Sequence, residues 1–342
     1  MKAIFGAHSP FRIFAFSSIA SLVVLAGVLF GMGLSGLLIA IVLTAVEIAF
    51  SFDNAILNAK ILSKMSRFWQ TMFLSAGAII AIFGMRIVFP ILIVAVTAHL
   101  EWSTVLHLAL HNPGEYAEKL EHAHPAISAF GGAFLLMLAL HFFADDTREI
   151  RWLERLERQL QRIATHWGPP VISLLTIAVI GVLPFNHHRR DTIVAGVLGV
   201  LVYALIHGFT TFFERMQARK AQIGLQTGIA AFVSFLYLEV LDASFSFDGV
   251  LGAFAVTNKV VLIAAGLGVG ALWVRSLTIF MVRRGTLDSY QFIEHGAHYT
   301  IGILAVLLFV SIFVGIPEAV TGLLGIGIIA ASVVASRQAL KE

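Results

Sequence analysis

The sequence predicts an all-α, polytopic membrane protein with about ten transmembrane helices in two inverted five-helix repeats. Three observations predict this fold: the apolar composition, the recurrence of apolar runs of spanning length, and a motif that occurs twice. Hydrophobic residues make up 58% of the 342 residues and charged residues only 13%, and the mean hydropathy is +0.90. A soluble domain carries about 25% charged residues. We therefore expect the whole chain to be built around a lipid bilayer.

The apolar runs define the expected spans, because each has about the 20 residues that a helix needs to cross a bilayer. The first run follows a basic start but lacks a small-residue cleavage site, so we expect it to be retained as a helix. The third and seventh runs are too long for a straight crossing and must tilt, break or extend past the bilayer. The expected spans are residues 12–32, 34–59, 68–98, 126–144, 169–186, 191–213, 224–257, 260–282, 299–316 and 319–336.

The distribution of Lys and Arg predicts the orientation of these spans. Seventeen of the 23 basic residues fall on the same side as the N-terminus, four fall on the other side, and Arg86 and Arg275 lie within spans. Basic loops face the cytoplasm, so both termini are expected to be cytoplasmic. Segment 148–167 has the period of an amphipathic helix that lies on the inner membrane surface. A solvated linker helix fits the same charge pattern equally well.

One motif occurs twice. The stretch from Glu47 to Asp53 reads E-x-x-F-S-F-D, and the stretch from Asp242 to Asp248 reads D-x-x-F-S-F-D. Downstream of each copy, an Ala-Gly pair precedes an arginine that lies nine residues after the glycine, Arg86 in the first copy and Arg275 in the second. The motifs "EHAH" and "EHGAH" follow in the same order. Three pairs of similar motifs that follow one another in the same order in both halves of the chain indicate an internal repeat.

The repeat and the topology together predict an inverted architecture. Corresponding spans are five apart, so the two copies run in opposite directions across the bilayer, as in many secondary transporters. The expected halves are residues 1–186, which include the amphipathic segment, and residues 187–342.

The motif acids fall near the middle of their spans, where a charged carboxylate is costly by several kcal/mol. A bound cation, a proton or a basic partner must offset that cost. Helical spacing aligns Glu47 with Ser51 and Asn54, and it aligns Glu239 with Asp242 and Ser246. A local unwinding at each Ser-Phe-Asp would turn the last acid inward, and we expect such breaks at the midplane. The residues next to the break, Asn54 and Gly249, tolerate unusual backbone angles.

These side chains supply an oxygen-only ligand set, and the chain has no cysteine. Such ligands suit a hard divalent cation such as Mn²⁺, Mg²⁺ or Ca²⁺. The cation is expected as a transported substrate, with no permanently bound cofactor. In the competing interpretation the acids form structural ion pairs with the arginines, which either shape the site or move with a gate. The expected metal ligands are Glu47, Asp53, Asn54, Glu239, Asp242 and Asp248, supported by Ser51, Ser246, Arg86 and Arg275.

Other functional classes lack motifs. The chain has no His-Glu-x-x-His, no Gly-x-Ser-x-Gly and no P-loop, so we expect no enzyme. The expected partners are the lipid bilayer and a divalent ion, without nucleic acid, and self-association into a homo-oligomer is left open. Segment 99–125 is expected to be a polar outside loop, whose histidines either capture metal or are solvated.

The paired motifs resemble those of TerC-type integral membrane proteins, in particular a longer branch of uncharacterised bacterial proteins. The resemblance implies export of a divalent metal, chiefly Mn²⁺, across the bacterial inner membrane, membership of the wider LysE-like exporter group, and a link to tellurite resistance. It extends to Glu47, Asp53, Asn54, Asp242 and Asp248. The chain departs from the family pattern at Gly249, where the family often has serine, so one oxygen ligand is lost.

These observations predict a secondary transporter that exports a divalent metal cation, with proton antiport as the candidate coupling. The alternative is a membrane component of a metal or tellurite stress-resistance complex that transports nothing itself.

Overall fold

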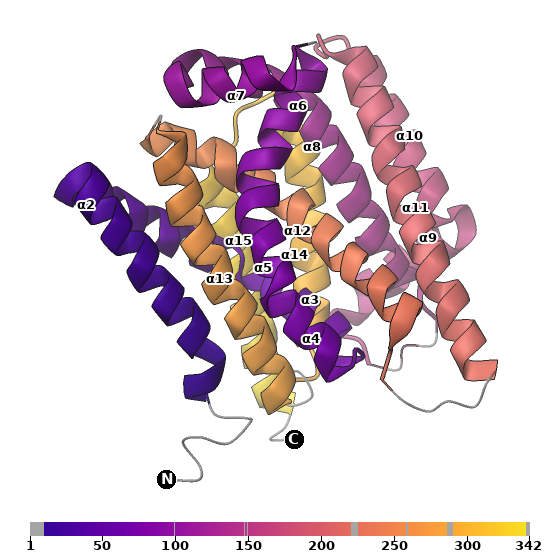
Figure 1. Ribbon diagram of the computed structural model, residues 1–342. Coiled ribbons are helices and arrows are strands. Elements are labelled where there is room, and N and C mark those ends of the chain that lie inside the picture. Colours follow the sequence, from indigo (N-terminus) through magenta and orange to yellow (C-terminus); the bar gives the residue numbers. More distant parts are fainter. Residues whose placement is uncertain are drawn as a thin grey trace, which may run out of the picture. The chain divides into compact units, whose positions relative to one another are not determined.

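The computed structural model describes residues 10–98, 100–146, 148, 150–219, 225–257, 259–285 and 290–339. In these ranges every regular secondary-structure element is a helix (Figure 1), which confirms the all-α fold class. The helices are α2 (Pro10–Phe50), α3 (Phe52–Ser63), α4 (Arg67–Leu74), α5 (Ala76–Ile79), η1 (Ile80–Val88), α6 (Phe89–Thr97), α7 (Trp102–His111), α8 (Pro113–Ala144), α9 (Glu154–Trp167), α10 (Pro169–Val182), α11 (Arg189–Arg219), α12 (Gly228–Val256), α13 (Val260–Arg284), α14 (Ile293–Ser311) and α15 (Glu318–Ala339).

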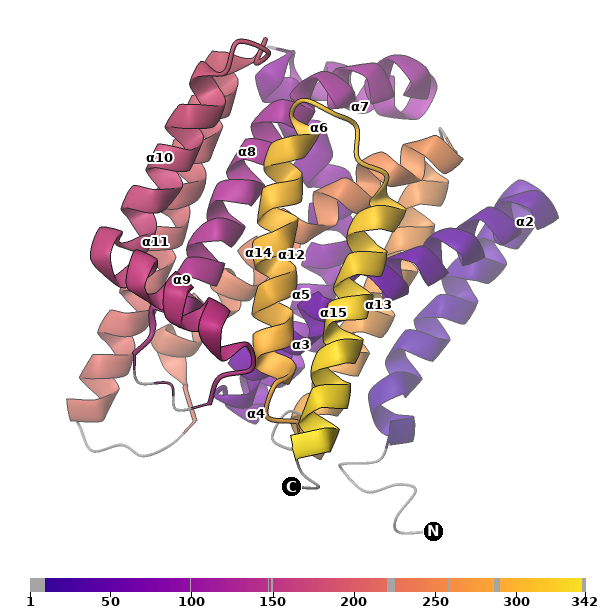
Figure 2. The same cartoon turned by 180° about the vertical axis from the view of Figure 1, so that it is seen from behind.

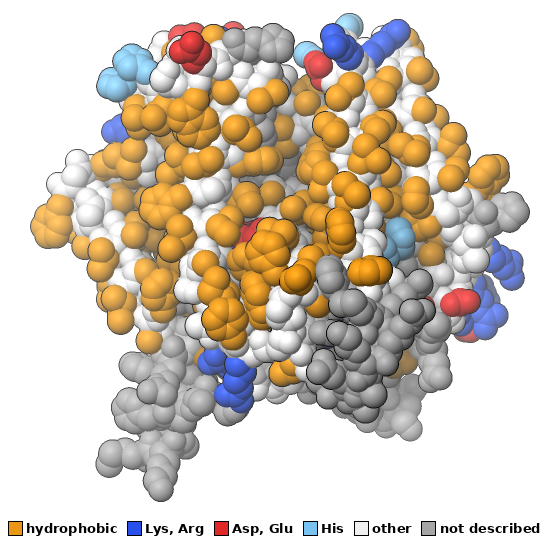
Figure 3. All heavy atoms as spheres, turned by 45° about the vertical axis from the view of Figure 1, so that its right-hand side comes forward, with side chains coloured by type: hydrophobic (Ala, Val, Ile, Leu, Met, Phe, Trp, Pro, Cys, Tyr) orange, Lys and Arg blue, Asp and Glu red, His pale blue; other side chains and the backbone are white. Residues whose placement is uncertain are grey.

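Seven helices of the described chain are long and apolar enough to cross a membrane, and the bent pair α9 and α10 brings the number to eight when it is counted as one span. Large apolar side chains are exposed on many of these helices, for example Phe30, which is 89% exposed. Hydrophobic side chains also cover most of the surface drawn in Figure 3. Soluble monomeric proteins rarely expose apolar surface of this extent to water. The helices therefore indicate a membrane protein, and each of the ten expected spans overlaps a helix.

The first two expected spans are joined in α2, and Gly33 separates them. This residue has φ 74° and ψ −171°, a conformation that is outside the helical region and favours glycine. The two arms of α2 diverge at the tip seen in Figures 1 and 2. The predicted boundary between residues 32 and 34 therefore coincides with the observed kink.

Two local expectations are wrong. Segment 99–125, expected to be a loop, is largely helical. In α7, Val105 and Ala109 are one helical turn apart and both are buried, so the helix has one buried face. The rings of His107 and His111, one turn apart on this helix, stack with their centroids 4.2 Å apart.

The expected break in the second motif is also absent, since α12 is helical throughout Gly228–Val256. Glycine permits a break but does not require one, and α12 contains no proline.

The chain divides into two compact units, which are described separately. Unit 1 comprises Met1–Ala123 and Leu238–Thr286, and unit 2 comprises His124–Tyr237 and Leu287–Glu342. Each unit thus combines segments from both halves of the sequence.

In unit 1, helix α13 packs along α2 and is buried over most of its length. Polar side chains join the two helices: Trp273 Nε1 donates to Ser21 Oγ at 2.9 Å, and Thr44 Oγ1 donates to the carbonyl of Gly266 at 3.0 Å. Such interhelical hydrogen bonds are typical of membrane bundles, in which the hydrophobic effect does not drive helices together.

In unit 2, the amphipathic helix α9 is held by the buried Glu157. Its Oε1 accepts hydrogen bonds from the backbone N–H groups of Trp152 and Leu153, at 3.1 and 3.2 Å, and from the hydroxyl of Tyr299 on α14, at 3.1 Å. Glu157 therefore caps the start of its own helix and ties it to α14, much as a capping box does. The helix ends at Gly168, and Glu154–Thr165 and Pro169–Val182 meet at 89°.

Substitution Glu157→Ala is expected to destabilise α9 by about 1–2 kcal/mol, because it leaves two backbone donors and the Tyr299 hydroxyl without their acceptor. Hydrogen exchange of the α9 amides, measured in detergent, checks this. The control is Glu154→Ala on the same helix, where an exposed carboxylate pairs with Arg158 and the loss should be within about 0.5 kcal/mol. Equal protection of α9 in both variants contradicts the capping role.

Candidate functional site

A buried ion pair joins Glu47 of α2 to Arg86 of η1 in unit 1. The two residues are 5% and 2% exposed, and Arg86 Nη2 donates to Glu47 Oε1. Ser51 Oγ donates to the same carboxylate oxygen at 3.2 Å. Glu47 and Ser51 therefore lie on one polar side, as predicted, and the guanidinium group of Arg86 compensates the charge of the Glu47 carboxylate.

Arg86 lies in a π-helical segment, Ile80–Val88, and its Nη1 donates to the carbonyl of Ala81 at 2.7 Å. Pro90 follows near the start of α6. Proline cannot donate to the carbonyl four residues earlier and clashes with it, and here that carbonyl belongs to Arg86. A widened π turn relieves this conflict, and such turns occur often at functional sites.

The second cluster is centred on Arg275 of α13, which is 3% exposed. Its Nη1 and Nη2 donate to the two carboxylate oxygens of Glu239, at 3.1 and 3.0 Å, and Nη2 also donates to Asp242 Oδ2 at 2.8 Å. Phe73 completes the cluster, because its carbonyl accepts from Nη1 at 3.1 Å and its ring centroid lies 4.2 Å from the guanidinium carbon. Bidentate geometry of this kind makes a strong, oriented pair.

Asn54 connects the two motif helices directly. Its Nδ2 donates to Asp242 Oδ1 at 2.9 Å, between buried side chains that are 188 residues apart in the sequence. The two copies of the motif therefore meet within unit 1, where α3 supplies Asn54 and α12 supplies Asp242.

Two glycines of α13 let α2 approach closely. A Cβ atom on Gly270 would lie 2.5 Å from Cβ and 2.6 Å from Cγ of Glu47, and one on Gly266 would lie 2.6 Å from Leu43 Cβ. Glycines four residues apart on one face are typical of tightly packed membrane helices. Gly270 thereby positions the backbone that carries Glu47.

The pairing follows the sequence repeat. Glu47 and Asp242 occupy equivalent motif positions, as do Arg86 and Arg275. Each arginine contacts the equivalent acid of its own copy, Arg86 with Glu47 and Arg275 with Asp242.

The structure brings together most of the residues predicted from the sequence: Glu47, Ser51, Asn54, Glu239, Asp242, Arg86 and Arg275. The side chains of Asp53, Ser246 and Asp248 lie outside the described part of the chain. Within that part, no group of three or more histidine or acidic side chains has a geometry suited to a metal ion. Sequence reasoning missed Phe73 and Gly270, although the "AGLGVGALWVR" run contains glycines at the spacing of close helix packing.

A family model described as "Protein of unknown function (DUF475)" matches residues 52–341, which is most of the chain. The chain is a DUF475 protein. The match includes Asn54, Arg86 and the entire second motif of this DUF475 chain, while Glu47 precedes it. No curated protein and no solved structure matches the DUF475 chain.

Proposed function

We propose that this DUF475 protein is a secondary transporter that exports a divalent cation, with Mn²⁺ as the first candidate and proton antiport as the candidate coupling. The observation that carries the proposal is the buried network in unit 1, in which carboxylates outnumber guanidinium groups. Among the side chains that the structure describes, three acids, Glu47, Glu239 and Asp242, contact two arginines. Such intramembrane charges usually mark an ion pathway.

In this proposal the two arginines compensate part of the negative charge of the three acids. A divalent cation or protons replace the guanidinium groups during transport, so the carboxylates always keep a compensating charge. In the sequence, Asp53 directly precedes Asn54, and Asp248 follows six residues after Asp242. The equivalent pairing in the two motif copies supports an inverted repeat. The proposal places ten spans in the bacterial inner membrane, and the distribution of Lys and Arg supports cytoplasmic termini.

The second candidate is a membrane component of a metal or tellurite stress-resistance complex that moves no ion. One observation favours it: the hydrogen bonds from Arg275 to Glu239 and Asp242 have the geometry of a structural ion pair. In that case the network stabilises the fold, and cation binding is not needed.

Flux measurements distinguish the two candidates. The purified protein is placed in liposomes that contain a metal-sensitive dye, and Mn²⁺, Mg²⁺ and Ca²⁺ are tested with and without a pH gradient. We expect flux that is lost in Asp242→Asn and kept in Asp191→Asn, which neutralises an exposed acid at the start of α11 in unit 2. Both variants are first checked for native helicity by circular dichroism. Wild-type liposomes that pass none of these cations would rule out the transporter and support the second candidate.

A further inference from the structure

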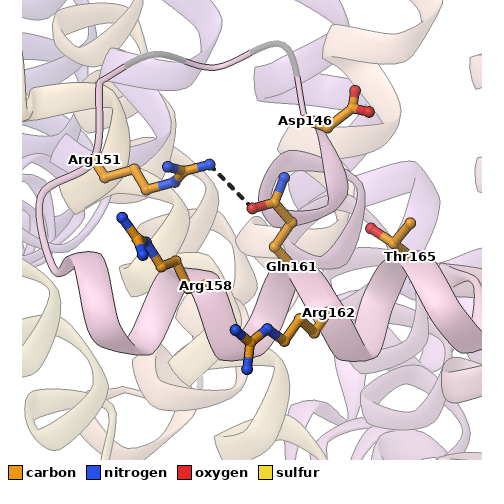
Figure 4. Close-up of a pocket in the computed structure, with 6 residues that line it drawn as sticks. All are labelled: Asp146, Arg151, Arg158, Gln161, Arg162 and Thr165. Carbon is orange, nitrogen blue, oxygen red and sulfur yellow. Dashed lines mark hydrogen bonds between the residues drawn. The ribbon is translucent and has the colours of Figure 1, made fainter.

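An open pocket lies beside helix α9 in unit 2. It has a volume of about 910 Å³ and is lined by Asp146, Arg151, Arg158, Gln161, Arg162 and Thr165. Figure 4 shows Arg151, from the segment before α9, and Gln161 of α9 pointing toward each other, with Arg158 and Arg162 on the same helix. The volume is that of a pocket for an organic ligand and is far larger than a single ion needs.

The pocket has an excess of positive charge. The described lining residues include three arginines and one acid, Asp146. Arg151 Nη2 donates to Gln161 Oε1 at 3.1 Å, a neutral partner, and Arg158 contacts Glu154 at 2.5 Å. Among the described residues, no carboxylate lies within ion-pair distance of Arg151 or Arg162. As far as the described residues go, the guanidinium groups of Arg151 and Arg162 can therefore bind an anion.

The pocket and the exposed apolar side chains lie on different sides of α9. Glu157 and Ala164 are buried, and Leu156, Ile163 and Trp167 are exposed. At 100° per residue, the arginines at 158 and 162 fall on the side of the helix opposite that apolar stripe. The stripe can therefore contact lipid while the arginines face water or the headgroup layer.

We propose that this pocket binds a phosphoryl-bearing anion. Arginine pairs with phosphate oxygens through two parallel N–H···O bonds. Both phosphate monoesters and phosphodiesters are negatively charged at neutral pH, opposite in sign to the charge excess of the lining. Gln161 and Thr165 add neutral donors that orient the group. The anion is either a soluble phosphate compound or a phospholipid headgroup, and the two sources share this chemistry.

The test uses the full-length protein in phosphatidylcholine nanodiscs. In the first arm, inorganic pyrophosphate is titrated calorimetrically at low ionic strength. In the second, nanodiscs that also contain phosphatidylglycerol are analysed by native mass spectrometry for retained phosphatidylglycerol. The test variant is Arg162→Gln, and the matched control is Arg155→Gln, an exposed arginine of the same helix outside the pocket. Arg151→Gln serves as a second test variant if Arg162→Gln does not fold.

We expect Arg162→Gln to weaken binding of one probe about tenfold or more, the effect of losing one charge-assisted hydrogen bond, and Arg155→Gln to change it less than about twofold. Selective loss of pyrophosphate binding identifies a soluble ligand, and selective loss of phosphatidylglycerol identifies a headgroup. If neither probe binds, or if both variants respond alike, the pocket is not a phosphoryl site and the proposal is overturned.

Discussion

Substitution of Arg275 by methionine is expected to destabilise the protein by about 3–5 kcal/mol, because it leaves Glu239 and Asp242 buried without their cation. The guanidinium group makes three hydrogen bonds to these acids and one to the carbonyl of Phe73. Methionine fills much of the volume but donates no hydrogen bond. The free energy of unfolding, measured in mixed detergent micelles, checks the prediction.

Two further variants show whether charge is the cause. Arg284→Met at the end of α13 removes an exposed arginine and should change the stability by less than about 1 kcal/mol. The triple variant Glu239→Gln, Asp242→Asn, Arg275→Met removes the unpaired charges as well and should recover part of the loss. A triple variant as unstable as Arg275→Met would show that packing, and not charge, dominates at this position.

Substitution Gly270→Val is expected to destabilise the protein by about 3 kcal/mol, at the upper end of the usual range for overpacking. A Cβ atom at this position already lies 2.5 Å from Glu47 Cβ and 3.1 Å from the carbonyl of Thr44. Helix α13 must therefore move away from α2, and Glu47 must shift away from Arg86. Thermal unfolding in detergent measures the loss of stability, and the flux assay should show a parallel loss of transport.

The matched control is Gly31→Val in the first arm of α2, where an added Cβ has no atom within 4 Å. Its stability should stay within about 0.5 kcal/mol of the wild type, because the substitution meets open space and changes only local helix propensity. Equal losses in the two variants would contradict the close approach of α2 and α13 as the cause.

Helix positions could largely be predicted from the sequence, because apolar runs of spanning length are a local property. The kink at Gly33 falls between the first two expected spans, and the amphipathic segment forms α9. The error at α7 has a physical reason: its polar residues suggested a loop, while only two side chains, Val105 and Ala109, are buried. The unbroken α12 shows that a glycine after a polar motif does not by itself break a helix.

The candidate site could be predicted in composition but not in pairing. Polar residues in apolar spans identified Glu47, Asn54, Asp242 and the two arginines, since such residues are rare at bilayer depth. The π turn that carries Arg86 lies just before Pro90, whose missing N–H and ring favour such a turn.

The sequence by itself determined that this chain is helical, that it is suited to a membrane, and that it carries two copies of an acidic motif with one arginine each, because these depend on residue type and spacing along the chain. Only the tertiary structure decided that Arg86 forms an ion pair with Glu47 and that Arg275 forms ion pairs with both Glu239 and Asp242. The physical reason is distance: ion pairing depends on separations of a few ångströms between side chains that are 33 to 39 residues apart. The glycines of α13 let α2 approach closely at Leu43 and Glu47, and this approach sets the position of Glu47.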